Sequence, residues 1–247
     1  MTKAVTKAQT TEVSTEQATE LANIFGTATN VSSNDIIIPK LMCMQGLSQL
    51  VMDGKARFGE FVDSTTEEVV GSIDTGIELI PFMMEKLWYL SERVGDDYEF
   101  KGIEPVTPAN ENSPYEFMLD GKAMKRQMVR NFYFLNPNDM GLPCIVSFKG
   151  MSTRAGKQLA TLMYLKNPSE GKQPPAYHVI VSGEKTKNDK GTFAVLKVSK
   201  GNPSAVEEQM EAAKWYKTIM SGQAKAHDVV EEDAKPKQQA TSDECPF

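Results

Sequence analysis

The sequence is poor in the residues that most enzymes and metal proteins need. It has three cysteines and two histidines among 247 residues, and none of them lies at the spacing of a metal-binding motif. It also lacks a phosphate-binding glycine loop, a dinucleotide-binding fingerprint and a nucleophile elbow. We therefore expect a protein that is not an enzyme and that uses no metal or other cofactor.

Long hydrophobic runs are also missing. No stretch of about 18 apolar residues is present, so the sequence predicts no membrane span. The N-terminus has no apolar signal core. Cys43, Cys144 and Cys245 are odd in number and far apart, which favours reduced thiols over a disulfide framework. Together these absences predict a cytoplasmic protein.

Charge is unevenly distributed along the chain. The formal net charge is −6, yet residues 35–120 carry 6 basic and 17 acidic residues (net −11), while residues 121–226 carry 17 basic and 7 acidic residues (net +10). A basic block of this size is a candidate surface for a polyanion. Two alternatives stay open: the two halves pair their charges in the fold, or the acidic half holds the magnesium ions of a nuclease.

Both ends of the chain differ in composition from the middle. Residues 1–34 are rich in Thr, Ala and Ser, and residues 227–247 contain six acids and two lysines. Such segments bury too little apolar surface to offset the entropy lost on ordering. The sequence thus predicts a disordered arm over 1–34, a folded domain over 35–226 and a disordered acidic tail over 227–247.

The tail closes on Asp243, Glu244, Cys245, Pro246 and Phe247. This segment resembles the C-terminal tip of bacterial and phage single-stranded DNA-binding proteins, which is acidic and ends in Pro-Phe. Cys245 departs from that pattern, because the family usually has an aliphatic residue there. The resemblance implies that the tail binds replication proteins such as a polymerase, primase or helicase through Asp243, Glu244, Pro246 and Phe247. The alternative is an ordinary solvated terminus.

The middle of the chain is strand-like. Apolar patterns predict five strands and a helix after the third, over residues 77–92, 123–135, 142–151, 154–165 (helix), 177–185 and 192–199. A second helix is expected from Pro203, capped by Asn202, with Val206, Met210, Ala213 and Met220 as its apolar stripe. The polar, proline-containing residues 95–120 are expected to form a loop or an extended hairpin tip.

This element order is that of the OB-fold barrel, in which one face and its flanking loops receive oligonucleotides. We therefore predict a mainly β protein with flanking helices (α+β), built on a five-stranded OB-fold-like barrel. Residues 36–71 are expected to be an N-terminal elaboration that contains a hairpin over 57–71. Other α+β folds share this order and remain alternatives.

The second predicted strand carries the chemistry that single-stranded DNA requires. Alternation places Arg126, Arg130 and Phe132 on one face and Lys125 and Tyr133 on the other. Cations pair with phosphates and rings stack on bases. The alternative for each Phe is a place in the core.

Other candidates lie on neighbouring elements. Trp88 and Tyr89 point to opposite faces of the first strand, so we expect one of them to line a groove and the other to pack inside. The predicted nucleic-acid-binding residues are Lys86, Trp88, Lys125, Arg126, Arg130, Phe132, Tyr133, Lys149, Arg154, Lys157, Lys185, Lys187 and Lys190.

The resulting functional expectation is a protein that binds and protects single-stranded DNA without sequence specificity during DNA replication or recombination. If a bacteriophage encodes it, its place is the host cytoplasm. A strand-annealing recombination mediator and an interaction scaffold that never touches nucleic acid are the alternatives. The oligomeric state stays open.

Overall fold

The computed structural model describes residues 36–166, 175–188, 191–222 and 224–226. The predicted arm over 1–34 and the predicted tail over 227–247 lie outside these residues. The strands are β1 (Ile37–Ile38), β2 (Leu41–Cys43), β3 (Glu60–Asp63), β4 (Val69–Ser72), β5 (Ile77–Val94), β6 (Asp97–Pro105), β7 (Glu116–Leu119), β8 (Lys122–Asn136), β9 (Asp139–Phe148), β10 (Tyr177–Asn188), β11 (Gly191–Pro203) and β12 (Lys225–Ala226). The helical segments are α2 (Gln49–Met52), η1 (Gly150–Ser152), α3 (Thr153–Thr161), η2 (Leu162–Lys166) and α5 (Val206–Met220).

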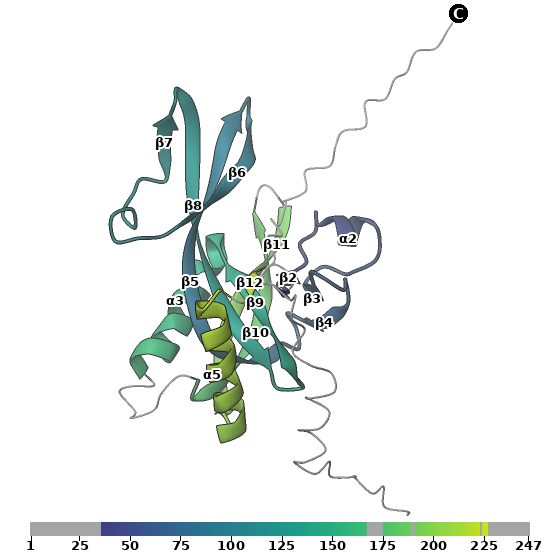
Figure 1. The fold of residues 1–247 in the computed structure, drawn as a ribbon. Helices are drawn as coiled ribbons and strands as arrows, with labels where there is room; N and C mark the ends of the chain where they lie inside the picture. Colours follow the sequence, from purple (N-terminus) through teal and green to yellow (C-terminus); the bar gives the residue numbers. More distant parts are fainter. Residues whose placement is uncertain (1–35, 167–174, 189–190, 223, 227–247) are drawn as a thin grey trace, which may run out of the picture.

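A long antiparallel ribbon of β5 and β8 organises the molecule. Their register runs from Ile80↔Leu135 to Glu92↔Met124. At one end of the ribbon, β10 pairs with β5 and β9 pairs with β8, and β11 adds to β10. At the other end, β6 pairs with β5 and β7 pairs with β8. The protein is mainly β, with a body and a four-stranded projection (Figure 1), which we call the finger.

The expected order of the five strands and the helix is confirmed, and of the two alternatives for residues 95–120, loop or extended hairpin tip, the structure has the hairpins. They contribute β6 and β7, which extend the sheet into the finger. A bulge lies in the β5–β6 pairing between Leu90 and Ser91. This irregularity and three prolines hide the strand alternation in the sequence.

The sheet does not close into the expected barrel. Among the described residues, the edge strands β9 and β11 are not paired with each other. Their outer backbone groups bond elsewhere: Ile145 N donates to Pro39 O at 2.8 Å, and Ala194 N donates to Gln45 Oε1 at 2.8 Å. Leu196 N donates to Ser152 Oγ at 2.9 Å. The N-terminal residues and η1 therefore occupy the space between the two edges.

The N-terminal elaboration forms a three-stranded antiparallel sheet, in the order β2-β3-β4. Its β3–β4 pair is the hairpin expected within residues 57–71. The residues before it form strand β2 and the short helix α2. Phe61 on β3 is fully buried in the main core, so this sheet is part of the fold rather than an appendage.

Apolar side chains cover both faces of the body sheet. Phe132, Phe134 and Phe148 pack with Leu159 of α3 in one cluster. On the opposite face, Tyr133 and Leu135 pack in a second cluster with Ala212 of α5. Figure 1 shows α3 and α5 flanking the body of the sheet. Neither face of the body sheet therefore remains free over these residues.

Helix α5 agrees with the sequence-based prediction at its end and differs from it at its start and on its buried face. Gly222, at φ 75°, follows the end of α5, in the left-handed conformation that commonly terminates a helix. The helix begins at Val206 rather than Pro203, and Asn202 bonds to Glu78 instead of capping it. Its predicted apolar stripe faces solvent, with Met210 61% exposed. Ala212, Trp215 and Ile219 pack inward instead, because they lie over the second cluster.

Candidate nucleic-acid interface

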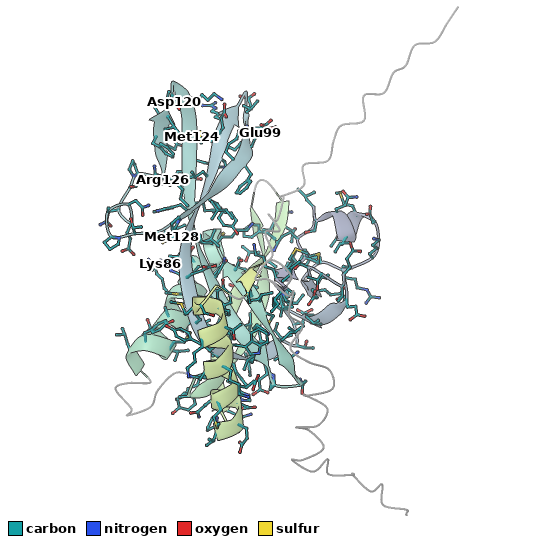
Figure 2. The ribbon with its side chains drawn as sticks, in the orientation of Figure 1. Lys86, Glu99, Asp120, Met124, Arg126 and Met128 are labelled. Carbon is teal, nitrogen blue, oxygen red and sulfur yellow. The ribbon has the colours of Figure 1, made fainter. Side chains whose placement is uncertain are left out.

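The finger is a single layer of four strands, in the order β6-β5-β8-β7. Figure 2 shows Lys86 and Met128 at its base, Arg126 midway, and Met124, Glu99 and Asp120 toward its tip. Direct cross-strand pairs share one face of a sheet. The register therefore defines a tryptophan face (Trp88, Met124, Arg126, Met128 and Arg130) and a tyrosine face (Tyr89, Tyr98, Phe100 and Lys125).

On the tryptophan face, the predicted ring and cations are present but covered. Trp88 is 6% exposed, and its Nε1 donates to Asn110 Oδ1 at 3.2 Å. Lys86 Nζ lies 2.5 Å from Glu111 Oε1. Both partners belong to the segment 106–115 that joins β6 to β7. Contrary to expectation, Trp88 is therefore not available to stack on a base in this conformation.

The two arginines of this face are packed against protein groups. The Arg126 guanidinium lies 4.0 Å from the Phe117 ring centroid and 5.9 Å from that of Trp88. Arg130 is 8% exposed, and burial lowers the pKa of its guanidinium, an effect that the nearby charge of Glu111 opposes. Both residues were predicted to bind DNA from an open groove, and the structure instead places them beneath other side chains.

Nearer the tip, acids pair with two further cations, Lys101 and Lys122. Lys122 Nζ lies 2.9 Å from Glu92 Oε1, and Lys101 bridges Glu92 (3.5 Å) and Glu99 (3.0 Å). The hydrogen bond from Lys122 is the largest influence on Glu92 and lowers the pKa of its carboxyl. Lys122–Glu92 joins the acidic half of the chain to the basic half, so part of the basic excess is balanced within the fold.

The tyrosine face has a different character. Tyr89 and Phe100 meet edge to face, with ring centroids 5.8 Å apart. Lys125 Nζ lies 3.7 Å from the centroid of the Tyr98 ring. Tyr98 and Phe100 are each 37% exposed. This face thus presents accessible rings beside a cation, the combination that binds unpaired bases and their phosphates.

Two predicted binding residues belong to the core instead. Phe132 is fully buried and packs edge to face on Phe148 at 5.4 Å. Tyr133 is 3% exposed, and its hydroxyl donates to Glu85 Oε1 at 2.9 Å. Burial, reinforced by Glu85, raises the pKa of Tyr133. The prediction for both was wrong because helices cover both faces of the body sheet at these positions.

The other predicted cations lie outside the finger. Lys149 follows β9, half-buried, and Arg154 and Lys157 are exposed on α3. Near the β10–β11 connection, Lys185 Nζ lies 5.2 Å from the Phe58 ring centroid, and Lys187 is exposed. The predicted residues are therefore divided among the finger, the start of α3 and the end of β10. Lys190, Asp243, Glu244, Pro246 and Phe247 lie outside the described residues.

The described part of the chain contains no group of three or more His, Cys, Asp or Glu side chains that could hold a metal ion. Its one histidine, His178, bonds to carboxylates on both sides, with Nδ1 2.9 Å from Glu78 and Nε2 2.8 Å from Glu208. This arrangement ties α5 to the sheet. None of the described helices has the length and apolar composition that a membrane crossing requires.

Comparison with known proteins gives a family. The family model for Pam3 phage gp34-like protein matches residues 9–225. The chain belongs to this Pam3 phage gp34-like family. The family's description points to a phage protein and names no activity. No curated protein matches the chain, and no solved structure does.

In this member of the Pam3 phage gp34-like family, the covered ring of an adjacent pair is the one that was expected at the groove. Trp88 was expected at the groove, yet it is covered, and Tyr89 lies on the open face. Tyr98 and Phe100 were missed because their segment looked like a loop. Their spacing of two residues was the signal that could have placed both rings on one face of a strand.

Proposed function

We propose that this protein binds single-stranded DNA without sequence preference, and that the tyrosine face of the finger is its principal contact. Tyr89, Tyr98 and Phe100 stack on bases, and Lys125 pairs with phosphate. The observation that carries the proposal is the exposure of Tyr98 and Phe100, at 37% each, beside a lysine on a sheet face that no second layer of the described residues covers.

The arrangement of strands supports the same function. OB folds are partly open barrels in which the connections between strands one and two, and between strands four and five, contact oligonucleotides. We propose that this body is a modified OB fold with β5, β8, β9, β10 and β11 as its five strands. On that assignment the finger elaborates the first connection, and the turn near Lys185 and Lys187 is the second.

The lysines and arginines outside the finger, and the membership in a phage protein family, also support this function. Lys149, Arg154, Lys157, Lys185 and Lys187 supply further phosphate contacts along the bound strand. The acidic segment 227–247 competes with DNA for these cations, and on release its Pro246-Phe247 pair recruits replication proteins.

Fluorescence anisotropy with labelled oligo-dT tests this function. We expect saturable binding that weakens steeply between 50 and 200 mM salt, because each neutralised phosphate releases condensed counterions. Mixed-sequence oligonucleotides of equal length should bind with similar affinity, and duplex of the same length more weakly. Lack of binding at low salt would refute the proposal.

Strand annealing by an oligomer is the second candidate. It is favoured by the solvent-facing apolar stripe of α5, where Val206, Met210 and Met220 are 66%, 61% and 64% exposed. A second copy of the chain could cover this stripe. Light scattering that reports a ring-sized assembly, together with faster pairing of complementary strands, would favour annealing over simple protection. A monomer in both free and DNA-bound samples would exclude it.

A further inference from the structure

The segment 106–115 caps the base of the tryptophan face through two side chains. Asn110 accepts a hydrogen bond from Trp88, and Glu111 pairs with Lys86. Asn110 is itself fixed, because Thr107 N donates to its Oδ1 at 2.7 Å and its Nδ2 donates to Pro105 O at 3.1 Å. The cap is therefore an organised turn that covers a ring and a cation.

The face that carries Trp88 and Lys86 also holds two guanidinium groups whose hydrogen bonds are incomplete. Within the described residues, Arg130 Nη1 and Arg126 Nε are buried and have no hydrogen-bond partner. Arg130 lies directly across the β5–β8 pair from Lys86, and the two share one face. Buried donors without an acceptor are costly, and an anionic oxygen is the ligand that satisfies a guanidinium best.

We propose that the tryptophan face is a second subsite for single-stranded DNA, taking one phosphate and an adjacent base, and that Glu111 occupies the phosphate position in the free protein. This inference rests on the proposed function and adds a site to it. An incoming phosphate displaces the Glu111 carboxylate, bonds to Lys86 and reaches Arg130. Trp88, released from Asn110, then stacks on the base.

The geometry of the segment suits such a displacement. Its two ends are anchored to the sheet, since Val106 N donates to Lys86 O at 3.0 Å and Arg126 N donates to Tyr115 O at 2.8 Å. Between these anchors, the Lys86–Glu111 pair is partly exposed, at 33% and 43% of the side chains. Solvent-exposed ion pairs of this kind contribute little stability, so a ligand phosphate can replace the carboxylate.

The fluorescence of Trp88 can report the binding of DNA to this subsite. The chain has two tryptophans, so Trp215→Phe leaves Trp88 as the single indole. In that background we expect oligo-dT to quench Trp88 emission in proportion to binding measured independently by anisotropy. We also expect Glu111→Gln to bind oligo-dT severalfold more tightly, because the internal competitor has lost its charge.

The matched control is Glu104→Gln. Glu104 lies on β6 in register with Trp88, and its carboxylate is exposed. Its replacement by Gln therefore removes the same charge from the same part of the finger without opening the cap. If Glu111→Gln raises the affinity for oligo-dT no more than Glu104→Gln does, the proposed subsite is refuted. Trp88 emission that stays constant while anisotropy shows saturation would refute it as well, and in both cases the proposed function would survive. Absence of anisotropy binding by every variant would refute the function, and the subsite with it.

Discussion

Truncating the two exposed rings of the tyrosine face is the sharpest test of the interface. A base stacked on an aromatic side chain contributes about 1–3 kcal/mol, measured by alanine substitution. Since about 1.4 kcal/mol corresponds to a factor of ten, Tyr98→Ala and Phe100→Ala should each weaken oligo-dT binding about 5- to 150-fold. Both rings are more than one-third exposed, so the variants should remain folded.

Salt dependence separates stacking from charge in this test. Neither substitution removes a charge, so plots of the logarithm of affinity against the logarithm of salt should shift downward and keep their slope. Tyr216→Ala is the matched control, because Tyr216 is 45% exposed on α5, outside the finger. Unchanged affinity in the Tyr98 and Phe100 variants, or an equal loss with Tyr216→Ala, would refute the assignment of the tyrosine face.

Three further outcomes follow from the same structure. Lys125→Ala should weaken all sequences alike and reduce the salt slope by about one unit, as a titration at several salt concentrations would show; an unchanged slope would argue against a phosphate contact. Deleting residues 227–247 should tighten oligo-dT binding and abolish capture of replication proteins, whereas weaker binding would contradict competition by the acidic segment. Burial would raise the pKa of the Glu208 carboxyl, but hydrogen bonds from His178 and Ala205 N outweigh burial and lower it from 4.5. A carboxyl with a lowered folded-state pKa stabilises the fold above its unfolded-state pKa, and this contribution is lost as the pH falls through the folded-state value. Glu208→Gln should therefore lower the Tm at neutral pH, with a deficit that shrinks below pH 4.5, and a deficit independent of pH would contradict this account.

The strands of the body were predictable because their signal is local. Alternating or continuous apolar runs placed β5, β8, β10 and β11 close to their observed bounds. The finger was not predictable in the same way. Strands β6 and β7 lie in a single layer with solvent nearby, so they need few apolar residues and do not show the pattern of a buried strand.

Residues that lie far apart in the chain determine which of the candidate side chains are accessible. Periodicity placed Phe132 and Tyr133 on opposite faces of β8 correctly, yet it could not reveal that α3 and α5 cover those faces. For the same reason the sequence could not choose between Trp88 and Tyr89. The choice depends on Asn110, which lies 22 residues away from Trp88 along the chain.

The sequence alone determined a mainly β fold, the order of the five body strands with α3 and α5, and a basic later half beside an acidic earlier one, because propensity, alternation and charge are properties of short segments. The tertiary structure alone decided that the sheet stays open, that its ribbon extends into a finger, and that the accessible rings are Tyr98 and Phe100 rather than Phe132. Exposure depends on which segments pack over a strand, and that packing is set by contacts between residues far apart in the chain.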